Sequence, residues 1–174
     1  MKMISPYAEN LPTGVLHSKK LIAFFINHLN RIYCAKSHLQ KNLPEMREHA
    51  HFSDLINAIT ETLIDVEKQI SRMDEIYAIL DVRPGFEDCL GVIGLIDDTF
   101  SAISQEIDDP EMSDLSILFY LQNIEAIEMA SFKMLNLAAP KLGHKDIKQL
   151  LKENFNEAQE DLVLLQEITS KYLQ

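Results

Sequence analysis

Long apolar runs and paired cysteines are both missing from the sequence, and each absence excludes a class of protein. No stretch approaches ~18 uninterrupted apolar residues, and the N-terminal residues lack the apolar core of a signal peptide. Cys34 and Cys89 lie far apart and match neither a CxxC motif nor a Cys/His zinc spacing, so we interpret them as buried, reduced thiols. We therefore expect a cytoplasmic protein that neither spans nor binds a membrane.

The sequence also has little positive charge and none of the common catalytic or nucleotide-binding motifs. The net charge is −11, and Lys and Arg form no cluster of the kind that displaces counterions from phosphates, so we expect no nucleic-acid partner. There is no Gly-x-Ser-x-Gly elbow, and Gly91 and Gly94 fall in an apolar segment that has no phosphate-binding loop pattern. Hydrolytic chemistry and nucleotide binding therefore have no support.

The composition that remains is that of one globular domain. Apolar residues make up 47% of the 174 residues, with 5 Gly and 6 Pro, which disfavours a disordered or fibrous chain. Residues 1–17 contain Pro6, Pro12 and Gly14 without a sustained period, and we predict a flexible N-terminal arm there. We expect residues 18–174 to form a single helical domain.

Apolar residues recur every three or four positions along most of the chain, which is the spacing of one helix face. The pattern predicts long helices at 18–43, 53–80, 114–139 and 145–172, and a shorter apolar helix at 89–105. Pro44 should end or kink the first helix, with a short further turn up to Ala50. No run alternates at period two, so we expect no strand. The predicted fold class is all-α, an up-down four-helix bundle with a short extra helix in the crossover between the second and third long helices.

Charged residues interrupt the apolar stripes near the middle of three of these helices. Lys36, Glu125, Glu128 and Glu157 lie on the stripes, and Glu67 borders the stripe of the second long helix. Charged side chains rarely occupy such positions unpaired. Bundles that bind two iron or manganese ions place a Glu on each of two helices and Glu-x-x-His on the other two, and this chain supplies carboxylates without the histidines. Helix rotation that puts Glu67 and Asp161 at a solvated edge or a dimer seam stays open as an alternative.

Several short strings, taken in order and spacing over residues 18–172, resemble the bacterial YciE/YciF-type stress proteins. The strings are Ile32-Tyr33-Cys34-Ala35-Lys36, Leu43-Pro44-Glu45-Met46, Gln69-Ile70-Ser71-Arg72-Met73, Cys89-Leu90-Gly91-Val92-Ile93-Gly94-Leu95, Ile124 to Phe132 and Lys141-Leu142-Gly143. The resemblance implies a ferritin-like bundle, often a homodimer, of poorly defined stress-linked function.

The departures from that family fall in its metal site. The family's Tyr-x-Ala-Glu string ends here in Lys36, and its Glu-His-x-Glu string reads Glu125-Ala126-Ile127-Glu128. On the second helix a Glu-x-x-His place reads Ile64 to Glu67, and on the fourth helix Glu157 remains while neighbouring acidic places have become Ala158 and Leu162. A buried ammonium supplies the same sign of charge as a metal ion. We therefore hypothesise that Lys36 replaces the metal.

Two functions from different classes follow, and the residues favour the first. The first is a non-enzymatic, dimeric, stress-associated protein of undefined biochemical role, whose degenerate dimetal site binds no cofactor. The alternative is an oxidase or iron-handling protein that binds iron or manganese through Glu67, Glu125, Glu128 and Glu157. A scaffold that binds other proteins through an exposed helix face is a third possibility. The segment Glu48-His49-Ala50-His51 contains metal-ligand spacings, but its place between helices favours a structural role.

Overall fold

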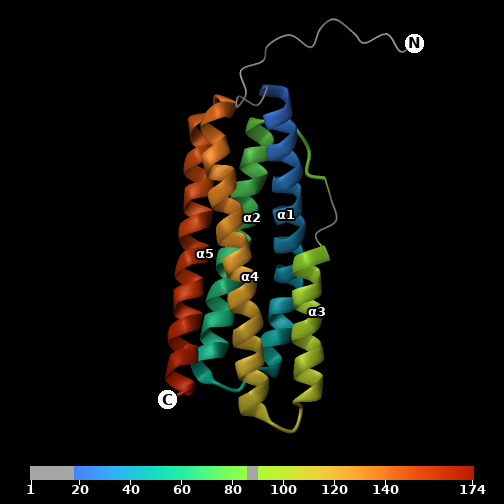
Figure 1. Cartoon of the computed structure of the whole chain (residues 1–174), viewed down its shortest axis with the longest axis vertical. Coiled ribbons are helices and arrows are strands. Elements are labelled where there is room, and N and C mark those ends of the chain that lie inside the picture. Colours follow the sequence, from blue (N-terminus) through green and yellow to red (C-terminus); the bar gives the residue numbers. More distant parts are fainter. Residues whose placement is uncertain (1–17, 86–89) are drawn as a thin grey trace, which may run out of the picture.

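The computed structural model describes residues 18–85 and 90–174, and within these ranges the chain is all-α without a strand, as predicted. The predicted N-terminal arm, residues 1–17, lies outside the described residues. The helices are α1 (Ser18–His49), α2 (Ser53–Ile79), α3 (Leu90–Gln105), α4 (Pro110–Ala138) and α5 (Lys145–Tyr172), with a 3-10 turn, η1 (Ala139–Leu142), before α5. Four of them are long and form the bundle, and α3 is the predicted extra helix in the crossover (Figure 1).

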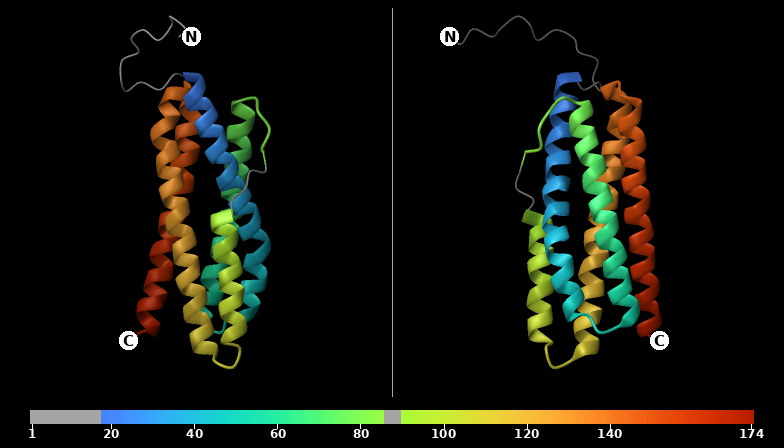
Figure 2. Two further views of the ribbon diagram at one scale, coloured as in Figure 1. Left: turned by 45° about the vertical axis from the view of Figure 1, so that its right-hand side comes forward. Right: turned by 180° about the vertical axis from the view of Figure 1, so that it is seen from behind.

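The topology is two antiparallel helix pairs joined by a long crossover. In Figure 1 the chain runs down α1, up α2, down again through α3, up α4 and down α5. The crossover makes α2 and α4 parallel, which short connections alone do not allow. Figure 2 shows that α3 lies against only the lower half of the bundle, beside α1 and α4, and leaves their upper halves uncovered.

Pro44 neither ends α1 nor starts a separate turn, so that part of the prediction was wrong. The helix continues through Pro44 to His49. Leu39, Leu43 and Met46 are fully buried at helical spacing on either side of the proline, whose own ring is exposed. Burying these large side chains outweighs the one backbone hydrogen bond that proline removes.

The start of α4 also differs from the prediction, by four residues. Asp109 caps the helix by accepting a hydrogen bond from the backbone N–H of Met112 at 3.2 Å, and Pro110 occupies the first turn, where its missing N–H costs nothing. The residues just before the predicted start of the helix therefore form its N-terminal cap and first turn. At the other end Gly143 adopts φ +82°, the left-handed conformation that lets the chain turn into α5.

The core is divided along the bundle axis. An upper apolar cluster includes Phe25, Met73 and Phe132, and a lower one includes Leu39, Ile59 and Leu121. Between them lies a layer of buried polar side chains from all four long helices, and this layer is the candidate site. In the part of the chain described, none of the helices combines the length and the apolar character needed to cross a membrane.

Candidate functional site: a buried lysine and carboxylate cluster

The polar layer is centred on Lys36, which α1 places inside the bundle. The stripe of α1 runs through Leu29, Ile32, Lys36 and Leu39, and since helix positions three and four apart share a face, Lys36 points where its apolar neighbours point. Its side chain is 0% exposed. Glu125 and Glu128 face inward from α4, because they too are three residues apart on a buried stripe.

The Lys36 ammonium group is paired directly with Glu128. Its Nζ atom contacts Oε2 of Glu128 and lies 4.0 Å from Oε2 of Glu125. All three side chains are at most 2% exposed. Asp161 of α5 is 5% exposed and also acts electrostatically on Lys36. We call Lys36, Glu125, Glu128 and Asp161 the Lys36 cluster.

Lys36 stays charged in this environment. Burial alone would lower the pKa of the ammonium, because a low-dielectric interior disfavours the charged form. Glu125, Glu128 and Asp161 together outweigh that effect and raise the pKa of Lys36 above its ordinary value. The cluster therefore holds a permanent positive charge at its centre near neutral pH.

The carboxyl groups of the cluster are shifted toward their protonated forms. Burial raises the pKa of Glu125 well above its ordinary value, and the attraction of Lys36 offsets only part of this rise. Burial also raises the pKa of Glu128, against the opposing effect of its ion pair with Lys36. The pKa of Asp161 is raised to about 7, again chiefly by burial. The single ammonium group of Lys36 thus does not keep all three carboxyl groups ionised. We take Glu128 as its ionised partner and Glu125 as neutral.

Several buried polar atoms in the same layer have no hydrogen-bond partner among the described residues. They include both carboxylate oxygens of Glu125, the side-chain amide of Gln69, and the hydroxyl of Thr62. Asn154 is better satisfied, since it donates to the backbone C=O of Gln69 at 3.4 Å and accepts from Arg72 at 3.2 Å. Unsatisfied buried groups are costly, so this layer lowers the stability of the bundle.

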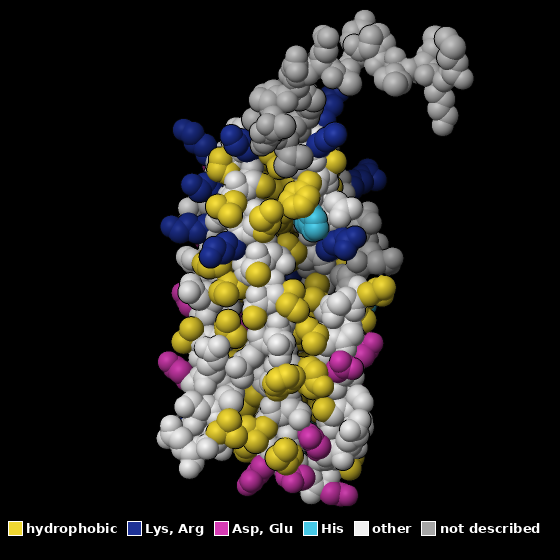
Figure 3. Space-filling view, viewed as in Figure 1, with side chains coloured by type: hydrophobic (Ala, Val, Ile, Leu, Met, Phe, Trp, Pro, Cys, Tyr) yellow, Lys and Arg dark blue, Asp and Glu magenta, His cyan; other side chains and the backbone are white. Residues whose placement is uncertain are grey.

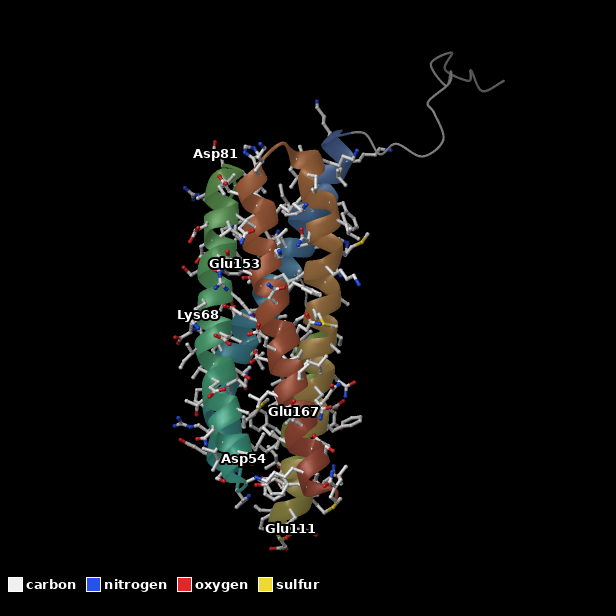
Figure 4. The ribbon with its side chains drawn as sticks, turned by 90° about the vertical axis from the view of Figure 1, so that its left-hand side faces the viewer. Asp54, Lys68, Asp81, Glu111, Glu153 and Glu167 are labelled. Atoms are coloured by element: carbon white, nitrogen blue, oxygen red, sulfur yellow. The ribbon has the colours of Figure 1, made fainter. Side chains whose placement is uncertain are left out.

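Glu157 and Glu67, both predicted as site residues, are not brought to Lys36. Arg72 of α2 holds Glu157 in a two-pronged ion pair, with N–O distances of 2.6 and 2.7 Å, and also contacts Glu153 at 3.1 Å. Figure 4 shows Glu153 and Lys68 on the outer face where α5 and α2 lie side by side. Glu67 is exposed, so its side chain points to solvent and not into the polar layer.

Sequence reasoning missed the acid of α2 that acts on the cluster and left that of α5 undecided. Asp65 of α2 raises the pKa of both Glu125 and Asp161, although its side chain is 23% exposed and paired with Lys68 at 2.7 Å. Asp161 is buried, so the alternative that helix rotation places it at a solvated edge is wrong. The sequence feature that indicates an interior position for Asp161 is its helical spacing from Asn154 and Leu165, which are also buried.

The histidine-rich segment at the end of α1 has a structural role. Glu48 and His49 are exposed, and the ring of His51 lies 3.2 Å from Asp114 of α4. The carboxylate of Asp114 also accepts hydrogen bonds from the backbone N–H groups of His51 and Phe52. Asp114 thereby fixes the α1–α2 turn against α4.

The residues present do not fit the pair of metal ions that bundles of this kind hold. Within residues 18–85 and 90–174, no three His, Cys, Asp or Glu side chains converge tightly enough to hold a metal ion. The ammonium group of Lys36 contacts the Glu128 oxygen that a metal ion would need as a ligand. Arg72 forms an ion pair with Glu157.

Four long helices, a crossover with its own helix and a polar mid-layer define the ferritin-like class of all-α bundles. Within that class the chain belongs to the family described as "Domain of unknown function (DUF892)", whose model matches residues 20–174. The resemblance to YciE/YciF-type proteins is thereby confirmed.

Three comparisons illustrate how similar the known members are. Protein YciF of Escherichia coli (strain K12) is 25% identical over 143 residues, covering 82% of this chain and 86% of YciF. The solved structure of YcfI from Rhodopseudomonas palustris is 29% identical and matches with a TM-score of 0.79 over 90% of this chain and 98% of YcfI. The crystal structure of the E. coli stress protein YciF matches in fold with a TM-score of 0.83, at 23% identity, over 88% of this chain and 96% of YciF.

Proposed function

We propose that this chain is a non-enzymatic, stress-associated, cytoplasmic bundle protein in which the ammonium group of Lys36 takes the place of a metal centre. The observation that carries the proposal is the fully buried ion pair between Lys36 and Glu128, with Glu125 at 4.0 Å. The stress association rests on the similarity of this chain to YciF, a stress protein of E. coli. A homodimer, implied by the family resemblance, is part of the proposal.

The physical argument is that a permanently charged side chain does internally what an ion does in a metal-binding bundle. Carboxylates that face one another in a low-dielectric interior repel, and a cation is needed if any of them is to stay ionised. Lys36 provides that cation covalently, and the raised pKa values of Glu125 and Asp161 favour their neutral forms, which need no counter-charge. Such a core is independent of metal supply, and it offers neither an open coordination position nor a redox-active group.

The alternative, an iron or manganese oxidase or iron-handling protein, requires Glu67, Glu125, Glu128 and Glu157 to act together. Glu67 is exposed and Glu157 is engaged by Arg72, so the four carboxylates do not surround one volume. The arrangement gives this alternative less support than the first function.

Metal analysis tests the proposal. Protein produced with excess iron or manganese and then dialysed should retain under roughly a tenth of an ion per chain, because displacing Lys36 from Glu128 would cost more than a single new ligand returns. The variant Lys36→Glu, which adds a carboxylate and removes the ammonium, should retain clearly more metal. Far-UV circular dichroism establishes that both proteins are folded. About one or two ions per wild-type chain would establish the oxidase alternative, and an equal metal content in the variant would count against the assignment of the site.

A further inference from the structure

Five lysines lie on one stretch of the surface, where α4, η1 and the start of α5 meet. They are Lys133 of α4, Lys141 of η1, and Lys145, Lys148 and Lys152 of α5, and all five are exposed. We call them the lysine patch. They are three or more positions apart in the sequence and form no basic run, so only the fold brings them together. Figure 3 shows Lys and Arg gathered over the upper parts of α4 and α5, with Asp and Glu lower on the same face.

Helix geometry places the three lysines of α5 on the side away from α2. Glu157 forms an ion pair with α2 and therefore marks the side of α5 that faces that helix. At roughly 100° per residue, Lys148 is about 180° around α5 from Glu157. Lys145 and Lys152 are about 120° and 140° from it. Asp146, the one acid in this segment, is within about 20° of Glu157. The acids in this half of α5 and the lysine patch thus lie on different sides of the helix.

Lys133 reaches the same surface from α4. Gln122 of α4 donates a hydrogen bond to the hydroxyl of Thr169 of α5 at 2.8 Å and so marks the side of α4 that faces α5. Lys133 follows Gln122 at a spacing that returns to within about 20° of the same helix side. Packed helices lie ~8–10 Å apart, so Lys133 lies at about that distance from the row of lysines on α5.

The charges of the lysine patch are not neutralised within the molecule. Among residues 18–85 and 90–174, none of the five lysines forms an ion pair, whereas the exposed Lys68 and Lys171 both have carboxylate partners. His144, at the N-cap position of α5, forms no side-chain hydrogen bond with that helix. The first N–H groups of α5 therefore have no capping side chain. The patch thus offers an anion five ammonium groups and the positive end of a helix dipole.

We propose that the lysine patch binds the sugar–phosphate backbone of double-stranded DNA without reading its sequence. Clustered lysines bind a duplex because they release the counterions condensed on its phosphates. Lysines on two neighbouring helices, ~8–10 Å apart, can contact both strands across a groove that is ~6 to ~12 Å wide. A single linear chain of phosphates would occupy only one of the two helices.

The side chains around the patch favour a duplex over a single strand or a bilayer. Single strands bind through aromatic side chains that stack on their bases, and Phe119, the large exposed aromatic residue of α4, lies in the lower half of that helix. A bilayer surface requires apolar anchors beside the basic residues. Leu137 is the strongly exposed apolar side chain nearest in sequence to Lys133 and Lys141, and one leucine is smaller than the single acyl chain that gives only marginal membrane binding.

The net charge of −11 opposes this contact only weakly, because most of the acids are distant from the patch. The helix α5 has 28 residues and is thus about 42 Å long, with the lysines in its first third. Acids at the lower end of the bundle are therefore several Debye lengths away, at ~8 Å each in physiological salt. The expectation of no nucleic-acid partner rested on net charge and on basic runs, and neither describes a patch that the fold assembles. The patch shares no residue with the Lys36 cluster, so this inference does not rest on the proposed function.

Fluorescence anisotropy of a labelled DNA duplex of about 20 base pairs tests the proposal with the full chain. At about 50 mM salt the wild type should bind unrelated sequences equally well, and log K against log salt should have a slope between about −2.5 and −4.5, since each neutralised phosphate contributes about −0.9. Lys148→Gln/Lys152→Gln should raise the dissociation constant at least ~10-fold and make the slope shallower by about 1.8. Lys148→Arg/Lys152→Arg, which keeps both charges, should bind like the wild type.

The matched control is Lys41→Gln/Lys171→Gln, which makes the same change of charge at exposed lysines in the lower half of the bundle and should leave binding unchanged. Circular dichroism establishes that all variants are folded. A wild type that does not bind the duplex, an equal loss of affinity in the control, or an unchanged affinity in Lys148→Gln/Lys152→Gln would overturn the proposal. So would tighter binding, per phosphate, to a single strand or to inorganic polyphosphate, or sedimentation with phosphatidylglycerol vesicles while the duplex stays free.

Discussion

At the scale of single residues, Lys36 shows how a buried charge depends on its neighbours. Lys36 lies on the buried stripe of α1 between Ile32 and Leu39, and its terminal ammonium reaches Glu128. Each charge alone would be expensive in the interior, and the pair is tolerated because each offsets the desolvation of the other. The cost of burying either charge therefore depends on the presence of the other.

Lys36→Met should destabilise the protein by about 3–5 kcal/mol, because it keeps the packing volume but leaves Glu128 buried without its counter-charge. The double variant Lys36→Met/Glu128→Gln should recover a large part of this loss, since it removes both charges. Urea unfolding of the wild type, both single variants and the double variant gives the coupling energy. Additive single effects would show that Lys36 and Glu128 are not coupled. Lys68→Met, at an exposed ion pair, is the control that should leave stability unchanged.

Lys36, Glu125 and Glu128 could be placed in the interior from sequence because each sits at helical spacing between large apolar residues. Glu67 could not be placed correctly by the same rule. It lies two residues from Asp65, about 200° around the helix, and a stripe drawn through Leu63, Val66 and Ile70 runs between the two. Glu157 was on the right stripe, but its partner Arg72 is 85 positions away in the sequence, and periodicity contains no information about such a pair.

At the scale of elements, Asp114 connects α4 to the turn between α1 and α2 through hydrogen bonds. It is fully buried in the second turn of α4, and its carboxylate accepts from the backbone N–H groups of His51 and Phe52 at the start of α2. These donors have no partner within α2, because the first N–H groups of a helix lack preceding carbonyls. The α1–α2 turn is thus capped by a different helix.

Asp114→Ala should cost at least ~2 kcal/mol in the free energy of unfolding, because it leaves two backbone donors unpaired and removes charge-assisted hydrogen bonds. Amide hydrogen exchange should accelerate most at His51 and Phe52. Asp109→Ala, which removes the cap of α4 itself, should cost only about 1 kcal/mol and leave exchange at those two amides unchanged. Equal losses of unfolding free energy in the two variants, without faster amide exchange at His51, would show that the hydrogen bonds of Asp114 contribute no more than an ordinary helix cap.

The number, order and type of the helices could be predicted from periodicity, and α5 was predicted with its observed bounds. Boundaries at proline were less predictable. Pro44 lies inside α1 and Pro110 at the start of α4, so the same residue type has opposite meanings, and what separates them is whether buried apolar residues continue beyond it. That continuation depends on tertiary packing, which a local pattern does not contain.

At the scale of the whole molecule, the polar layer makes stability depend on pH across the neutral range. The pKa of Asp161 is about 7 in the folded chain, compared with ~4 in an unfolded one. A carboxyl with a raised folded pKa favours folding most when it is protonated, below its unfolded pKa, and that contribution disappears as pH rises through its folded pKa. Glu125, whose pKa is also raised, acts in the same direction.

The free energy of unfolding should therefore fall as pH rises from about 4 to about 7, by at least ~1 kcal/mol. Asp161→Asn, which keeps the shape but cannot ionise, should make the decline shallower. Urea unfolding at several pH values measures both curves. If the wild-type curve is flat, or the variant's is as steep, the carboxyl of Asp161 is already ionised at low pH and the description of the layer is wrong.

The ion pair at the centre of the bundle also constrains how this protein can change over generations. A change of Lys36 to an acid in one step would leave a carboxylate beside Glu128 with no neutralising group unless an ion were available at once. Loss of the acids first would leave the ammonium group buried without a counter-charge. Each partner thus makes the other hard to replace alone, so the two residues are expected to change together.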